Sequence, residues 1–199
     1  MTPVTLRGTL AVLEPLTPSH TEALARVGLH AELWRLQPRA IGSLADMRTY
    51  VDQALQEQER GVSLPFAVRH LPSGMVVGST RYLEIALEHR RLEIGATWYT
   101  PAFQRSGVNV DSKLLLLGHA FDVLGVQKVV FKTETLNHQS RTAILALGAR
   151  EEGTFARQLI ADDGRTRDMI YFAIFDDMWP DVRRRLQHRL ERHAPLAKP

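Results

Sequence analysis

The clearest chemical pattern in this sequence lies between a predicted strand and a predicted helix. Leu92 to Tyr99 contains β-branched and aromatic residues and predicts a strand, whereas Val110 to Leu124 contains no proline, is rich in leucine and predicts a helix. The residues between them include the short polar loop Gln104-Arg105-Ser106-Gly107-Val108-Asn109. The first N–H groups of a helix have no internal partners, and the helix dipole adds partial positive charge there. This order of elements therefore predicts a binding site for an anion such as a phosphate.

Three carboxylates in or beside predicted strands could act as a general base. Glu93 belongs to the central strand, Glu134 ends the next strand, and Asp168 begins the last one. A carboxylate can take a proton from an attacking amine, directly or through a water molecule. For each residue the alternative is a solvated or hydrogen-bonded carboxylate with a structural role. The sequence leaves both interpretations open.

Size and composition bound the classes of protein to be considered. A chain of 199 residues is typical of one domain, and the absence of cysteine excludes disulfides, thiolate nucleophiles and cysteine-based zinc sites. The absence of cysteine is also compatible with a cytoplasmic protein, and the cytoplasm is the location we expect. The eight histidines form no His-x-x-x-His pair on a predicted helix, so we expect no metal site. No window reaches the roughly 18 apolar residues of a membrane span, and the N-terminus lacks the apolar core of a signal peptide.

The positive charge of the chain is concentrated at its C-terminus. The net charge is +3, and residues 181–199 carry six basic against two acidic side chains, which leaves residues 1–180 slightly acidic. Val182, Leu186 and Leu190 recur every four residues and predict one apolar stripe on a helix over 181–193. We therefore divide the chain into a body, 1–180, and a C-terminal basic amphipathic helix and tail, 181–199. The helix could pack on the body, on a twin subunit or on RNA.

The remaining patterns predict an alternation of strands and helices. Asn137 is a favourable N-cap for a helix that ends before Gly148, and Ser43 caps an earlier helix that ends at Gly61. A turn at residues 162–164 predicts a hairpin. The predicted strands are Leu10–Leu16, Pro65–His70, Met75–Leu83, Leu92–Tyr99, Gln127–Thr133, Glu151–Ile160 and Asp168–Phe175. The helices begin near Ser19, Ser43, Val110 and Asn137.

The pattern Gln104-x-x-Gly107-x-Asn109, set in this order of elements, resembles the GNAT superfamily of N-acetyltransferases. The family pattern has a small residue where this chain has Asn109, which tolerates left-handed backbone angles and caps helices well. Asn137-x-x-Ser140, with Gly148 and Gly153 after it, is similar to the subgroup that includes the ribosomal-protein N-terminal acetyltransferases. The resemblance covers residues 8–178. It implies an α/β (α+β) fold: a mixed, mostly antiparallel sheet splayed at its centre, with helices on both faces, here extended by a C-terminal helix.

The resemblance also implies a reaction and a set of site residues. The chain would move the acetyl group of acetyl-coenzyme A, used as a co-substrate and without a metal, directly to a primary amine on a protein N-terminus or a small molecule. The base in such a reaction would be one of the three carboxylates Glu93, Glu134 and Asp168. The helix that begins at Asn137 lacks the tyrosine that the family often uses to protonate the leaving thiolate. Ser140 is the nearest substitute, and the alternative is a surface serine without a catalytic role. The implied coenzyme-binding residues are Trp98, Tyr99, Gln104, Arg105, Ser106, Gly107, Val108, Asn109, Asn137 and Ser140.

Two other functions remain open. A non-catalytic acyl-coenzyme A sensor would explain the missing tyrosine and Asn109. A nucleic-acid binder would use the arginines of the C-terminal helix, but their charge is confined to one end and has no interleaved aromatic residues for stacking. We therefore expect an amine substrate as partner and neither a membrane nor nucleic acid. The ribosome and a second copy of the chain remain open as partners.

Overall fold

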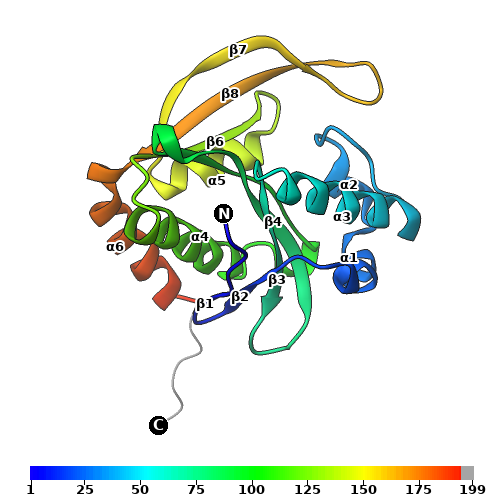
Figure 1. Ribbon diagram of the computed structural model, residues 1–199, viewed down its shortest axis with the longest axis horizontal. Coiled ribbons are helices and arrows are strands. Elements are labelled where there is room, and N and C mark those ends of the chain that lie inside the picture. Colours follow the sequence, from blue (N-terminus) through cyan, green and yellow to red (C-terminus); the bar gives the residue numbers. More distant parts are fainter. Residues whose placement is uncertain (194–199) are drawn as a thin grey trace.

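The computed structural model describes residues 1–193, so the end of the predicted tail, 194–199 with Lys198, lies outside the described residues. The chain forms one eight-stranded sheet in the order β1-β2-β3-β4-β5-β6-β8-β7, with helices on both faces (Figure 1). The strands are β1 (Leu6–Arg7), β2 (Ala11–Pro15), β3 (Leu64–His70), β4 (Val76–Ala86), β5 (Arg91–Tyr99), β6 (Lys128–Glu134), β7 (Arg150–Ile160) and β8 (Thr166–Phe175).

The helices cover the two faces of the sheet with two separate cores. One core joins the helices α4 and α6 to the sheet and includes Tyr82 and Phe172, and the other joins α1 to α3 and includes Met47 and Trp98. The helices are α1 (Thr21–Gly28), α2 (Ala31–Trp34), α3 (Leu44–Glu59), α4 (Val108–Gly118), α5 (His138–Leu147) and α6 (Trp179–Glu191). Shorter helical turns are η1 (Pro18–His20), η2 (Leu87–His89), η3 (Pro101–Phe103), η4 (His119–Val123) and η5 (Asp176–Met178). The predicted fold class is confirmed.

The sheet is antiparallel except at its centre. β5 and β6 are parallel and pair only over Arg91–Glu93 with Lys128–Val130. Beyond these residues β5 pairs with β4 alone, and β6 pairs with β8 alone. The two central strands therefore separate from Ile94 onward, as expected for a sheet that is splayed at its centre.

The C-terminal helix α6 packs on the body through the predicted apolar stripe. Val182, Leu186 and Leu190 are at most 8% exposed and belong to the same core as α4 and the sheet. Burying side chains of this size contributes roughly 1.5–3 kcal/mol each, which is more than exposed ion pairs usually give. Among the three alternatives for this helix, packing on the protein's own body is the one observed.

Some boundaries differ from the sequence prediction for physical reasons. The structure adds the two-residue strand β1 and the one-turn helix α2, both too short to leave a periodic pattern. α4 begins at Val108 instead of Val110 and ends at Gly118, after which η4 continues as a π-helical turn. α6 begins at Trp179, with Pro180 in its first turn where no N–H donor is needed.

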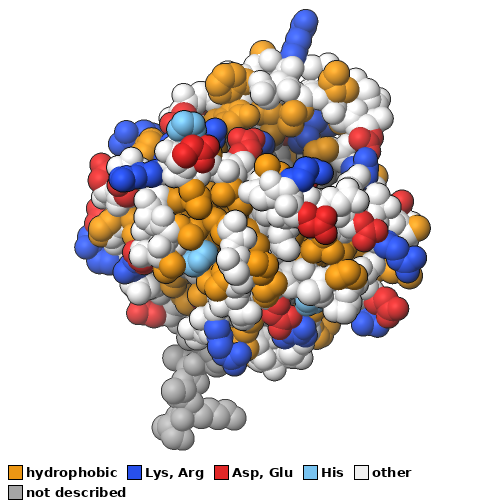
Figure 2. All heavy atoms as spheres, viewed as in Figure 1, with side chains coloured by type: hydrophobic (Ala, Val, Ile, Leu, Met, Phe, Trp, Pro, Cys, Tyr) orange, Lys and Arg blue, Asp and Glu red, His pale blue; other side chains and the backbone are white. Residues whose placement is uncertain are grey.

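The surface and the helices add two observations on possible partners. In Figure 2 the Lys and Arg side chains are scattered around the rim of the face shown, and hydrophobic side chains gather beneath the β7–β8 hairpin. Within the described part of the chain, no helix is long and apolar enough to cross a membrane.

Candidate active site

The predicted anion loop is shaped by two residues with left-handed backbone angles. Arg105 has a φ of 62°, and Gly107, the residue before α4, has a φ of 85°. A Cβ atom on Gly107 would lie 2.6 Å from the Cβ of His193 and 3.0 Å from Leu10. Glycine is therefore required both by the turn and by the close approach of the end of α6. The turn sets the backbone of Val108 and Asn109 at the N-terminus of α4.

The same loop is tied to both sides of the separated strands. The side chain of Gln104 donates a hydrogen bond to the carbonyl of Tyr99 at 3.3 Å and accepts one from Gln139 at 3.2 Å. Gln139 lies in the first turn of α5, two residues after the N-cap Asn137, whose side-chain oxygen accepts from the backbone N–H of Ser140 at 3.0 Å. The structure thus brings together the loop, the end of β5 and the N-terminus of α5.

The end of β5 carries a bulge that the sequence does not reveal. Ala96 has a φ of 46°, and the pairing of β4 with β5 shifts register between Ser79 and Arg81. After the bulge, Trp98 joins the core under α1 to α3, and Tyr99 joins the core under α4. A bulge re-aims the backbone and side chains of an otherwise regular strand. The backbone N–H groups of Trp98 and Tyr99, two of the predicted coenzyme-binding residues, therefore follow directly after the irregular segment that contains Ala96.

Glu93 lies where β5 and β6 begin to separate. Its side chain is 3% exposed, and its carboxylate forms an ion pair with Lys132 of β6 at 2.9 Å. Burial raises the pKa of Glu93, and the positive charge of Lys132 partly opposes this rise. Burial alone would lower the pKa of Lys132, but the carboxylates of Glu93 and Glu84 outweigh burial and raise it. A Cβ atom on Gly95 would lie 2.5 Å from the Glu93 carboxylate, so glycine is needed there for this conformation.

The other two predicted bases are occupied by structural contacts. Glu134 is 1% exposed and accepts from Arg167 at 2.8 Å and also from Arg165. Burial alone would raise the pKa of Glu134, but the two arginines outweigh it and lower the pKa. Asp168 is exposed and accepts from the backbone N–H of Arg157 in β7 at 2.7 Å. These contacts favour structural roles for both carboxylates and leave Glu93 as the strongest candidate base.

Two polar side chains share one face of α4, the half-buried Asn109 and the buried Lys113. Asn109 and Lys113 lie one helical turn apart and so project from the same face of α4. The Oδ1 atom of Asn109 is buried without a hydrogen-bond partner among residues 1–193, and Lys113 is 6% exposed. Sequence reasoning missed Lys113, although a lysine directly before the run Leu114–Leu117 was a visible signal. An unpartnered buried oxygen beside an anion loop fits a site for a polar ligand.

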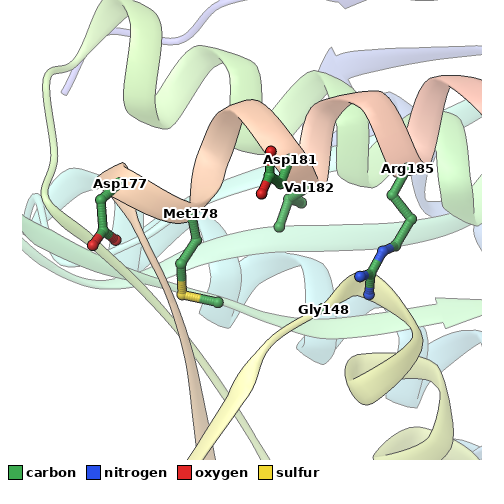
Figure 3. A pocket seen from close by; sticks show the side chains of 6 residues that line it. All are labelled: Gly148, Asp177, Met178, Asp181, Val182 and Arg185. Carbon is green, nitrogen blue, oxygen red and sulfur yellow. The ribbon is translucent and has the colours of Figure 1, made fainter.

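Two hollows at the surface lie outside this arrangement. One is formed by Gly148 and residues at the start of α6, and Figure 3 shows the side chain of Arg185 reaching toward Gly148. The other lies between α1 and the β3–β4 turn. None of the predicted site residues lines either hollow. Residues 1–193 also contain no group of three potential metal ligands.

Comparison with known families and solved structures shows which proteins this chain is similar to. Residues 11–150 match the family model described as an acetyltransferase (GNAT) domain. No curated protein sequence matches at a significant level. A protein from T. thermophilus assigned as an acetyltransferase is 31% identical, with a TM-score of 0.87 over 96% of this chain and 98% of that chain. A GCN5-related N-acetyltransferase from Brucella melitensis is 26% identical, with a TM-score of 0.89 over 98% of this chain and 87% of that chain.

A more distant neighbour supports the fold alone. RimJ from Mycobacterium smegmatis, whose structure contains a coenzyme A disulfide, is 23% identical, with a TM-score of 0.77 over 94% of this chain and 93% of that chain. The family model spans well over half of the sequence and includes the separated strands, the anion loop and α5. The chain belongs to the GNAT family of acetyltransferases.

Proposed function

We propose that this protein is an acetyl-coenzyme A-dependent N-acetyltransferase that acetylates a primary amine on a protein N-terminus or a small molecule. The observation that carries the proposal is the junction of the separated β5 edge with the Gly107 turn at the start of α4. The unpaired N–H groups of that helix start suit a pyrophosphate, and an unpaired strand edge suits the peptide-like arm of the coenzyme. Acetyl-coenzyme A would supply the acetyl group as a reactive thioester.

The residues expected to hold the coenzyme are those of the loop and of the N-terminus of α5. The backbone N–H groups of residues 105–109 would donate to the phosphates, and backbone groups near Trp98 and Tyr99 would pair with the arm. The side-chain oxygen of Asn137 is used in the helix cap, which leaves its amide group to donate elsewhere. Ser140 remains a candidate contact on the other side of the arm.

Glu93 is the proposed general base. It faces the side of the sheet that carries α1 to α3, because its neighbours Leu92 and Ile94 belong to the core under α4. A carboxylate with a raised pKa is closer to the pKa that an efficient base needs near neutral pH. The acceptor amine is therefore expected on the α3 side of the sheet.

Calorimetry with acetyl-coenzyme A tests the coenzyme site through two matched arginines. Arg105 and Arg90 are both exposed and both have left-handed backbone angles, but they lie beyond opposite ends of β5. Arg105→Glu should weaken binding by roughly tenfold or more, because it places a negative charge beside the pyrophosphate. Arg90→Glu should leave binding unchanged. Equal affinity in both variants and wild type would place the coenzyme elsewhere.

Gly107→Glu is a less informative variant. A side chain at Gly107 would be strained by its backbone angle and would collide with His193 whether or not a coenzyme binds there. Loss of binding in that variant would therefore not separate local unfolding from charge repulsion. The Arg105 and Arg90 pair avoids this ambiguity, because both side chains are exposed.

A further inference from the structure

Among residues 1–193, Lys113 is a buried amine without an acidic partner. Its Nζ atom donates to the hydroxyl of Thr97 at 3.0 Å, and that hydroxyl is 2.8 Å from the hydroxyl of Thr80. No carboxylate of residues 1–193 forms an ion pair with it. Burying an amine without a counterion is unfavourable. A site that retains such a group at this cost is a candidate for chemistry.

The surroundings of Lys113 leave its charge uncompensated. Burial lowers the pKa of Lys113 to about 7, and no other group contributes to the shift. Asp111, the nearest acidic residue along the helix, is turned toward β2 and accepts from the backbone N–H groups of Leu10 and Ala11. β4 and β5 present uncharged hydroxyl groups to this side of α4, namely those of Thr80, Tyr82 and Thr97. Lys113 can therefore hold a proton and also release it near neutral pH.

The position of Lys113 points to the reactive end of the bound substrate. Thr97 follows the Ala96 bulge, in the part of β5 that has no partner on the β6 side. Lys113 lies five residues beyond Val108, about 7.5 Å along the axis of α4 from the anion loop. A coenzyme with its phosphates at the loop and its arm along β5 would therefore direct its thioester toward Thr97 and Lys113. Glu93 approaches the same separation of the strands from the opposite face.

Building on the proposed function, we propose that Lys113 is the acid that protonates the sulfur of the departing coenzyme. The amine nitrogen attacks the thioester carbonyl carbon, a C–N bond forms, and the C–S bond breaks with its electron pair on sulfur. A proton from the Lys113 ammonium group moves to that sulfur and gives the free thiol. Neutral Lys113 then regains a proton from solvent, and Glu93 accepts the proton released by the amine. The products are an amide and coenzyme A.

This assignment moves the acid role from Ser140 to Lys113. A serine hydroxyl is a very weak acid, whereas an acid with a pKa near the working pH transfers a proton efficiently. The positive charge of Lys113 would also stabilise the thiolate while it forms. Ser140 would keep its backbone role in the cap of α5.

The test compares Lys113→Met with Lys128→Met. Met fills the volume of the lysine stem, and Lys128 is a lysine of β6 paired with Glu152 at 2.7 Å, away from the proposed site. We expect Lys113→Met to bind acetyl-coenzyme A with an affinity close to that of wild type but to lower kcat by roughly 100-fold. The ultraviolet absorbance of the thiolate measures a second property, the pKa of the thiol in bound coenzyme A. This pKa should be about one unit or more lower in wild type than in Lys113→Met.

Each outcome of this test has a distinct meaning. An unchanged kcat and an unchanged thiol pKa in Lys113→Met would overturn the assignment. A weaker affinity with both of those quantities unchanged would also overturn it, because Lys113 would then only hold the arm. If wild type itself binds no acetyl-coenzyme A, the proposed function fails first, and the calorimetric experiment identifies that case independently. Lys128→Met should match wild type in every measurement.

Discussion

At the scale of single residues, the pair Glu93 and Lys132 determines the expected pH dependence of the reaction. The base must be ionised to accept a proton, and burial raises the pKa of Glu93 while Lys132 holds it down. We predict that Glu93→Gln lowers kcat roughly 10²- to 10⁴-fold. Lys132→Met should shift the acidic limb of the pH–rate profile to higher pH, because its charge no longer favours the carboxylate. Steady-state kinetics across pH measures both effects, and an unshifted acidic limb in Lys132→Met would exclude Glu93 as the titrating group.

A second prediction at this scale concerns the stability cost of Lys113. One pKa unit corresponds to about 1.4 kcal/mol, so lowering the pKa of Lys113 from 10.5 to about 7 corresponds to a penalty of roughly 5 kcal/mol for the buried charge. Replacing the amine by Met removes this penalty but also removes the hydrogen bond to Thr97, so the free energy of unfolding should rise by roughly 1–3 kcal/mol at neutral pH. Below about pH 7 both the folded and the unfolded state hold the proton, so the penalty is complete. Between about pH 7 and 10.5 only the unfolded state holds it, so wild type gains stability and the difference narrows. Denaturant titrations of wild type and Lys113→Met at several pH values measure this difference in the free energy of unfolding. A difference that stays constant between pH 7 and 10.5 would contradict the prediction.

At the scale of elements, α6 supports the site as well as the core. Its apolar stripe packs against the body, and the residues that follow it bring His193 against Gly107 at the anion loop. We predict that Leu186→Asp lowers the free energy of unfolding by more than about 3 kcal/mol, because it buries a charge where Leu186 is 0% exposed. Arg184→Ala should change it by less than about 1 kcal/mol, because Arg184 pairs with Asp181 in solvent. Chemical denaturation of both variants measures these changes in the free energy of unfolding. Comparable losses of stability in the two variants would show that the apolar stripe is not the main contact between α6 and the body.

The sequence predicted the long elements well and the short irregular ones poorly. Clear periodicity or capping residues mark β5, β8 and α5, and these elements begin and end within two residues of their predicted bounds. β1 is defined by its pairing with β2 instead of its own pattern, so it left no local signal. The bulge at Ala96 was also invisible, because alanine has no preference for positive φ and the bulge follows from how β4 and β5 pair. Elements fixed by long-range pairing were therefore the ones missed.

In the candidate site too, the parts that follow from local sequence patterns were predictable, and the parts that depend on long-range contacts were not. The loop residues 104–109 and the cap at Asn137 follow from local patterns, and the structure links them through Gln104 and Gln139. The choice among the carboxylates was not predictable, because the contacts of Glu134 with Arg165 and Arg167 join residues about 30 positions apart. The burial of Lys113 depended equally on how α4 lies against β5. Its role and those of the other site residues stay predictions.

At the scale of the whole molecule, the proposed reaction uses both faces of the sheet. Glu93 projects toward α1 to α3, and Lys113 comes from α4 on the other face, so the proposed base and acid flank the separation of β5 and β6. The β7–β8 hairpin arches over the α3 side (Figure 1), where Asp162 near its tip pairs with Arg39 at 3.0 Å. The acceptor amine is therefore expected in the region framed by this hairpin, α3 and β5.

The measurement that tests the central claim most directly is mass spectrometry of a panel of amines after incubation with the protein and acetyl-coenzyme A. The panel should contain peptides with free N-termini, polyamines and aminoglycosides, with release of free thiol followed in parallel. We predict that at least one primary amine gains a single acetyl group at a rate that Glu93→Gln strongly reduces. If Glu93→Gln acetylates an amine as fast as wild type, the assignment of Glu93 as the base is contradicted. If the protein binds acetyl-coenzyme A but acetylates no amine, the proposed reaction itself is contradicted and a coenzyme-sensing role is favoured.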